Sequence, residues 1–141
     1  MTDQKMLTVN VVTPDGSVYE KQTPFVIFKT TLGELGVLPD HIPFLASLAI
    51  DEVRVKQGDA EDKFEEIAVG GGFVEFSNNL ATVVANSAER KENIDTARAA
   101  RARKRAEERL EKAKQAHDTD QVKRAEVSLR RAINRLNIAG H

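Results

Sequence analysis

The chain has 141 residues, no cysteine, and 21 basic against 22 acidic side chains, which give a formal net charge of −1. The length suits one ordinary domain, or a small domain with an appendage, and the lack of cysteine excludes disulfides and thiolate metal sites. The N-terminus does not resemble a signal peptide, and the apolar run from Ile42 to Ile50 is far shorter than the ~18 residues of a membrane span, so direct membrane insertion is not expected.

The composition changes near residue 88. All four prolines, all seven aromatic residues and seven of the eight glycines precede residue 78. Residues 1–88 carry a net charge of −7, whereas residues 89–141 carry +6. Such an asymmetry predicts two parts, 1–88 and 89–141, with different partners.

The first part predicts a series of short strands. Turn residues such as Pro14-Asp15-Gly16 and Asn78-Asn79 separate β-rich runs at intervals that favour a β-sandwich or flattened barrel. The expected strands are 6–12, 17–21, 25–30, 51–57, 64–69, 73–76 and 80–85. The expected core residues are Leu7, Val9, Val11, Phe25, Ile27, Leu38, Leu45, Val53, Val55, Ile67, Phe73 and Val83.

The second part predicts two antiparallel helices, which makes the fold class α+β. Asn93 is a candidate N-cap with Asp95 in the first turn, and Asp118 with Gln121 resembles a capping box that starts the second helix. Alanine dominates the apolar positions of both helices. Because alanine buries little apolar area, we expect a hairpin of marginal stability that can detach or dock elsewhere.

No catalytic or metal-binding set is apparent. Gly70-Gly71-Gly72 lacks the Lys-Ser/Thr of a phosphate loop and fits a strand corner. His41, His117 and His141 lack ligand spacing. We therefore expect a non-catalytic protein without a metal or a required cofactor.

Four arginines could meet at one end of the hairpin. Arg98 and Arg105 share a face of the first helix, and Arg131 and Arg135 share one of the second. An antiparallel arrangement would bring the two pairs together, where a polyphosphate would relieve their repulsion. A solvated helix face and a nucleic-acid surface are the alternatives, although glutamates interrupt the basic run and no aromatic residue lies nearby.

Two motifs resemble the epsilon subunit of F-type ATP synthase. The segment Gly33-Glu34-Leu35-Gly36-Val37-Leu38-Pro39-Asp40-His41-Ile42-Pro43 resembles its G-E-x-G-x-x-x-x-H-x-P signature. The segment Ile94-Asp95-Thr96-Ala97-Arg98-Ala99 resembles the motif at the start of its C-terminal helices. The order and spacing of the two motifs match this family across essentially the whole chain.

The resemblance implies a rotor subunit on the cytoplasmic face of the bacterial cell membrane. The family's sandwich, of about ten strands, binds the gamma subunit and rests on the c-ring of a proton- or sodium-driven synthase. Gly33 and Gly36 predict a tight exposed turn in this segment. By position, Glu34 and His41 would contact the ring, although they could instead only shape this turn. The family's helices form a brake that extends along gamma into the alpha/beta head and inhibits ATP hydrolysis.

The resemblance also implies ATP as a regulatory ligand that holds the hairpin folded. The matching positions are Glu89, Ile94, Asp95, Arg98, Ala99, Arg105, Arg131 and Arg135. Two alternative functions, a free-standing nucleotide sensor and a nucleic-acid module, would be distinguished by calorimetry with ATP and by salt-dependent duplex binding.

Overall fold

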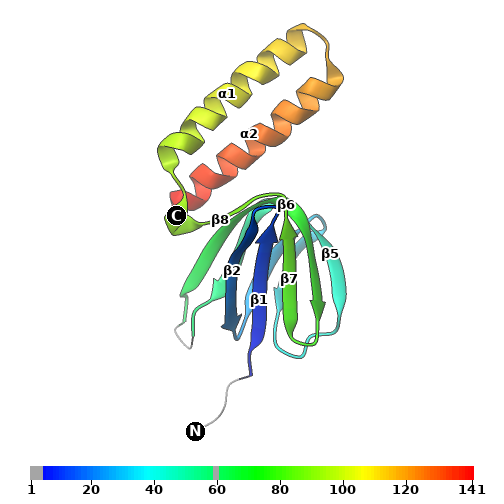
Figure 1. Cartoon of the computed structure of the whole chain (residues 1–141), viewed down its shortest axis with the longest axis vertical. Helices are drawn as coiled ribbons and strands as arrows, with labels where there is room; N and C mark the ends of the chain where they lie inside the picture. The colour runs from blue at the N-terminus through cyan, green and yellow to red at the C-terminus, as the bar shows by residue number, and fades with distance from the viewer. Residues whose placement is uncertain (1–4, 59–60) are drawn as a thin grey trace. The chain divides into compact units, whose positions relative to one another are not determined.

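The computed structural model describes residues 5–58 and 61–141, which form two compact units divided between Lys91 and Glu92 (Figure 1). The first unit consists of β-strands, and the second holds two long helices. This arrangement confirms the predicted α+β class, a sandwich followed by an antiparallel helix pair. The boundary predicted after residue 88 falls at the start of the short strand β8 (Ala88–Arg90).

The eight strands among the described residues form one hydrogen-bonded sheet, in the order β2-β1-β7-β6-β5-β3-β4, with β8 paired to β6. All neighbours are antiparallel except β1 and β7, which are parallel. Besides β8, the strands are β1 (Leu7–Thr13), β2 (Gly16–Thr23), β3 (Val26–Thr30), β4 (Gly33–Val37), β5 (Phe44–Lys56), β6 (Phe64–Ser77) and β7 (Leu80–Ala85).

The two longest strands carry the sheet from one layer of the sandwich into the other. β7 pairs with Gly72–Ser77 of β6, whereas β8 pairs with the other half of β6, at Ile67–Val69. Where these two halves of β6 meet, Gly71 and Gly72 have φ angles of 92° and 138°, which only glycine adopts easily. If each half of β5 and of β6 is counted separately, the eight strands provide the ten strand segments implied by the resemblance.

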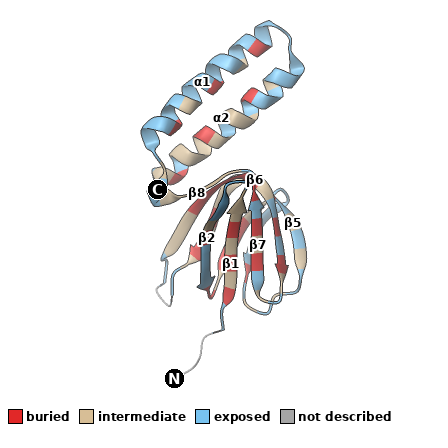
Figure 2. Ribbon diagram, in the orientation of Figure 1, coloured by how far each residue is buried: buried red, intermediate tan, exposed pale blue. Residues whose placement is uncertain are grey.

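The core lies between the two layers. Figure 2 shows buried residues alternating with half-buried ones along β1, and with half-buried or exposed ones along β7, as period-2 packing requires. The buried cluster comprises Leu7, Val9, Val11, Tyr19, Val26, Phe28, Val37, Leu48, Val53, Val55, Ile67, Val69, Val74, Phe76, Ala81, Val83 and Ala85.

Three predicted core residues are exposed, and a fourth, Phe25, is only half-buried and lies outside the buried cluster. Leu38, Leu45 and Phe73 are 60%, 71% and 42% exposed. Leu38 follows the end of β4 in a loop, and Leu45 lies on the outer side of β5. Phe73 follows the glycine bend, where the alternation of β6 changes phase and places Val74 and Phe76 inside instead.

The prediction that Gly33 and Gly36 make a tight exposed turn was also wrong. Residues 33–37 form β4, paired in register with β3. The reversal occurs at Thr31 and Leu32, where the Thr30 hydroxyl donates to the Gly33 carbonyl at 2.6 Å and accepts from the Leu32 amide at 3.2 Å.

The helical unit contains α1 (Thr96–Gln115) and α2 (Thr119–Ala139), preceded by a short 3-10 helix, η1 (Lys91–Asn93). Asp95, not Asn93, is the N-cap of α1, and its carboxylate accepts from the Arg98 amide at 3.0 Å. Asp118 caps α2 as predicted, by accepting from the Gln121 amide at 3.2 Å.

The connection between the helices is very short. His117 has a φ of 54°, and its amide donates to the Lys114 carbonyl while the Asp118 amide donates to the Ala113 carbonyl. These two bonds define a Schellman motif, so a single left-handed residue ends α1 and lets Asp118 cap α2 at once. The pairing of the helices therefore has little freedom in its register.

Candidate functional site

The predicted arginines occupy corresponding flanks of the two helices. Arg98 and Arg105 are exposed on α1, and Arg131 and Arg135 are half-buried on α2. The residues buried between the helices include alanines seven residues apart, Ala99, Ala106 and Ala113 on α1 and Ala125 and Ala132 on α2.

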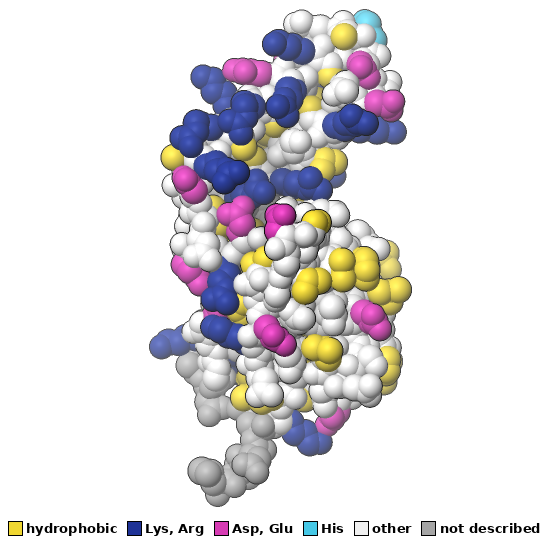
Figure 3. Space-filling model, viewed as in Figure 1, with side chains coloured by type: hydrophobic (Ala, Val, Ile, Leu, Met, Phe, Trp, Pro, Cys, Tyr) yellow, Lys and Arg dark blue, Asp and Glu magenta, His cyan; other side chains and the backbone are white. Residues whose placement is uncertain are grey.

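Helical geometry places these flanks on one face of the hairpin. At about 100° per residue, the arginines of each helix lie roughly 90° around the axis from its alanines, in the same rotational sense. Antiparallel helices are related by a twofold axis that preserves this sense, so the flanks share a side. The basic residues of this face include Arg98, Arg101, Arg105, Arg109 and Lys112 on α1 and Arg124, Arg131 and Arg135 on α2. Figure 3 shows Lys and Arg side chains crowded over the hairpin.

Three of the remaining predicted residues lie at the start of α1. Ile94 is half-buried just before the helix, Asp95 is its exposed N-cap, and Ala99 is buried in the seam. Glu89 lies on β8, within the sandwich unit, opposite Ala68 of β6. The structure thus gathers Ile94, Asp95, Arg98 and Ala99 within one helical turn and its cap.

The chemistry of this face suits a polyanion. Guanidinium groups bind phosphate oxygens in bidentate pairs. The Asp95 carboxylate already accepts from the Arg98 amide, so a phosphate here would meet arginine side chains rather than that backbone donor. The basic face is therefore a candidate polyphosphate site built from side chains of both helices.

On the sandwich, Glu34 is already paired. It lies opposite Lys29 in the β3–β4 register, and their side chains form an ion pair of 2.8 Å. The hydrogen bond from Lys29, aided by its charge, lowers the pKa of Glu34, and the same bond raises the pKa of Lys29. A partner would therefore meet Glu34 as an ionised carboxylate that is ion-paired with Lys29.

His41 is held by its own loop and by aromatic neighbours. Its Nδ1 donates to the Ile42 carbonyl at 2.7 Å, and its ring packs edge-on against Phe44 and Phe76 at 5.2 and 5.9 Å. These contacts fix the loop to the sandwich and leave the ring half-buried. The arrangement favours the structural role that the sequence left open for His41.

The sequence did not predict a further surface, because two of its residues, Leu45 and Phe73, were expected in the core. Phe73 and Val84 are cross-strand neighbours on the outside of β6 and β7, and Leu45 lies beside them on β5. A shallow depression next to Phe73 is lined by Pro43, Phe44, Leu45, Glu75, Phe76 and Ser77. Figure 3 shows hydrophobic side chains gathered on this side of the sandwich. We call Leu45, Phe73 and Val84 the outer apolar patch.

Comparison with known proteins accounts for both units. Residues 6–91 match the family described as ATP synthase, Delta/Epsilon chain, beta-sandwich domain, and residues 92–140 match its long alpha-helix domain. The chain is 63% identical, over the full length of both proteins, to the ATP synthase epsilon chain of Ligilactobacillus salivarius. It is 54% identical to that of Levilactobacillus brevis, over 99% of this chain and 98% of the relative.

A solved structure shares the fold. A chain in the structure of Euglena gracilis mitochondrial ATP synthase (OSCP/F1/c-ring in rotational state 1) aligns with a TM-score of 0.74 at 21% identity, covering 96% of this chain and 82% of that one. Neither α1 nor α2, the long helices of the described residues, is apolar enough to cross a lipid bilayer.

Proposed function

The chain belongs to the delta/epsilon family of ATP synthase subunits and is an epsilon subunit of the central stalk, and from this premise we propose that it couples rotation without catalysing a reaction. It turns with the gamma subunit and the c-ring of a proton- or sodium-driven synthase. It is held peripherally at the cytoplasmic face of the bacterial membrane. Its hairpin reaches the alpha/beta head when extended and suppresses ATP hydrolysis.

The observation that carries the coupling role is the outer apolar patch. The sandwich has a filled core, yet Leu45, Phe73 and Val84 are 71%, 42% and 38% exposed on adjacent strands. Adjacent exposed apolar side chains, including an aromatic one, are typical of surfaces that become buried in a complex. We assign this patch to the gamma subunit.

Binding of purified gamma subunit to the full chain tests the assignment. Phe73→Ser should weaken the complex about tenfold or more, because a central aromatic anchor of an interface contributes upwards of about 2 kcal/mol. Phe64→Ser is the matched control, since Phe64 lies at the other end of β6 and packs on Phe25 and Arg54. A wild-type chain that forms no complex with gamma would overturn the coupling role.

The regulatory role rests on the basic face. ATP bound across α1 and α2 contacts both helices only while they are paired, so it favours the folded hairpin and withdraws the brake when ATP is abundant. The binding residues in this proposal are Glu89, Ile94, Asp95, Arg98, Ala99, Arg105, Arg131 and Arg135.

Calorimetry of the full chain with ATP tests this regulation. Arg131→Ala and Arg135→Ala should each weaken ATP binding about tenfold, as expected for loss of one charge-assisted contact. Arg130→Ala is the control, because Arg130 is exposed and lies about 100° around α2 from Arg131. An absence of binding heat at millimolar ATP would remove the nucleotide proposal and leave the coupling role intact.

A further inference from the structure

The loop that follows β4 contains a strained turn. Leu38, Pro39, Asp40 and His41 form a reversal in which the His41 amide donates to the Leu38 carbonyl at 3.2 Å. Proline at the second position and a positive φ at the third are the features of a type II turn. The third residue is Asp40, with a φ of 68°, where glycine is usual. Asp40 therefore needs stabilising interactions that offset this backbone strain.

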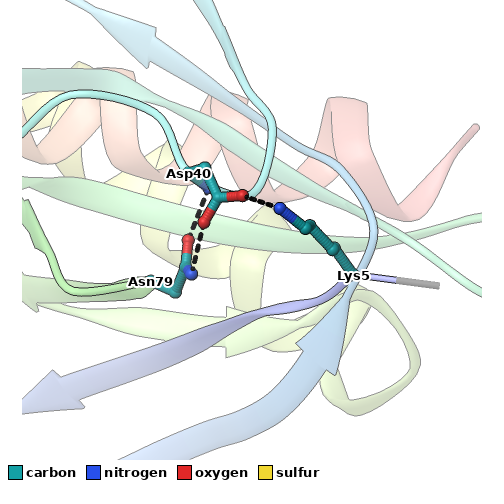
Figure 4. A network of polar contacts seen from close by, with 3 residues as sticks. All are labelled: Lys5, Asp40 and Asn79. Carbon is teal, nitrogen blue, oxygen red and sulfur yellow. Dashed lines mark hydrogen bonds and ion pairs between the residues drawn. The ribbon is translucent and has the colours of Figure 1, made fainter. Parts of the chain in front are cut away.

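The side chain and the backbone amide of Asp40 both form hydrogen bonds with Asn79 (Figure 4). The Asp40 amide donates to the Asn79 side-chain oxygen at 2.6 Å, and the Asn79 side-chain amide donates to the Asp40 carboxylate at 3.0 Å. Lys5 adds an ion pair of 2.6 Å to the other carboxylate oxygen. Two side-chain bonds in opposite directions fix both the backbone and the side chain of Asp40.

Asn79 is itself well anchored. It lies in the two-residue connection between β6 and β7, where Asn78 and Asn79 have φ angles of 52° and 58°. Its carbonyl accepts from the Thr8 amide at 2.8 Å, which ties the turn to β1. Asparagine tolerates such left-handed positions better than most residues, so this turn is a firm base for the clamp.

The clamped loop displays two apolar side chains. Leu38 and Ile42, on either side of Asp40, are 60% and 73% exposed. Two sets of contacts hold the loop in place. The His41 ring packs against Phe44 and Phe76, and the Asp40 amide donates to the Asn79 side chain. A loop preorganised in this way binds a partner without the cost of ordering it.

We propose that Asn79 is a positioning residue that holds the 38–42 loop in the conformation that docks on the c-ring. The inference rests on the proposed rotor function, which makes the ring the partner of this loop. Asn79 does not contact the ring. It acts through Asp40, and it raises the fraction of chains whose Leu38 and Ile42 are ready to bind.

The test compares two substitutions in one turn. Asn79→Gly removes the clamp while glycine keeps the positive φ of the turn, and Asn78→Gly changes the neighbouring residue, which is exposed, in the same way. With the full chain, gamma subunit and purified c-ring in detergent, Asn79→Gly should weaken binding to the ring about fivefold, the effect of losing one or two net hydrogen bonds. Asn78→Gly should bind like the wild type.

A second readout requires no partner. Amide exchange of His41 in the full chain should be about fivefold faster in Asn79→Gly than in Asn78→Gly, because the turn opens more often. Equal ring affinities, or equal exchange rates, for the two variants would overturn the positioning role. If the wild-type chain and gamma fail to bind the ring at all, the proposed ring contact falls, and the role of Asn79 in docking falls with it.

Discussion

Three carboxylates of the sandwich are engaged in ion pairs that limit what they can offer a partner. Glu34 is bound to Lys29, Asp40 to Lys5 and Asn79, and Glu65 to Lys21. Such exposed pairs add little to stability, about 0–1 kcal/mol each. Their larger effect is to fix the direction of each carboxylate, which matters if Glu34 faces the ring.

The pKa of Glu34 gives the first prediction. The hydrogen bond and charge of Lys29 lower this pKa, so Lys29→Gln should raise it toward the ordinary value of a glutamate. Because the folded-state pKa is depressed, the contribution of the pair is present above the unfolded-state pKa and is lost as the pH falls through the folded-state pKa. The measurement is an NMR titration of the Glu34 carboxyl carbon.

Lys21→Gln is the control for this titration. Lys21 forms the corresponding ion pair with Glu65, at 2.7 Å, on other strands of the sandwich. Its replacement removes one positive charge from the same domain and should leave the Glu34 pKa unchanged. A Glu34 titration that is the same in wild type and Lys29→Gln would show that the pair does not persist in solution.

At the scale of elements, the bend in β6 decides which residues face the core. Gly72 has a φ of 138°, and a Cβ added there would lie 2.1 Å from the Val84 carbonyl oxygen. This oxygen belongs to the backbone of β7, so it cannot move aside as a flexible side chain would. The close approach of β6 and β7 therefore depends on the absence of a side chain at residue 72.

Gly72→Ala should consequently lower the free energy of unfolding of the sandwich by about 3 kcal/mol or more, through both backbone strain and the clash. Gly16→Ala is the matched control, since Gly16 also has a positive φ, 117°, but an added Cβ would meet nothing within 4 Å. Urea unfolding of both variants separates the two costs. If the two variants lose equal stability, strain alone accounts for the effect and the clash is refuted.

The helix pair depends on small residues in the same way. Ala132 is fully buried in the α2 seam, so Ala132→Leu should force α1 and α2 apart and destabilise their pairing by about 1–3 kcal/mol. Ala100→Leu, at an exposed position of α1, should change stability by less than about 0.5 kcal/mol. Thermal unfolding followed by far-UV circular dichroism measures both. An Ala132→Leu variant as stable as the control would mean that the seam can relax.

Local signals in the sequence predicted most elements but not the phase of every strand. Alternation located β1 and β7 correctly, and Asp118 with Gln121 marked the start of α2. Residues 25–30 are apolar on both parities, so the burial of Val26 and Phe28 rather than Phe25 could not be predicted. β4 was missed because two glycines in five residues suggested a turn, whereas pairing with β3 determines its conformation.

Helical periodicity predicts where side chains share a face. The spacing of Arg98, Arg105, Arg131 and Arg135 predicted a shared basic end, and a nucleotide site there stays a prediction. The outer apolar patch and the Asn79 clamp were not predicted. Both depend on tertiary structure, namely the phase change at Gly71 and Gly72 and a contact between residues 39 positions apart in the sequence.

At the scale of the whole molecule, the sandwich and the hairpin have opposite net charges and separate cores, which suits two units with different roles. The sandwich has its own buried cluster, and the hairpin has its own alanine seam and caps at both helix starts. A basic hairpin of this kind is attracted electrostatically to acidic surfaces. Because its seam buries mostly alanine, we expect the pairing of the helices to be marginal, so that a ligand or partner could shift its state.

Removal of the hairpin tests the braking role, and the structure determines where the chain should be cut. Ending at Ala88 would remove Glu89 and Arg90 of β8, which pair with β6, and would also remove the contact of Arg90 with the Tyr19 ring at 5.0 Å. A chain ending at Lys91 keeps β8 and leaves the sandwich as observed. With a chain ending at Ala88, the loss of a brake could not be distinguished from damage to the sandwich.

With the head reconstituted around gamma, the chain ending at Lys91 should therefore give ATP hydrolysis at least about twice as fast as the full chain, since removing a brake engaged half of the time doubles the mean rate. The difference should shrink as ATP rises if nucleotide binding folds the hairpin. Both versions should bind gamma equally, which shows that the sandwich is intact. Equal hydrolysis rates at low ATP, with equal gamma binding, would contradict the braking role and leave coupling as the function of this subunit.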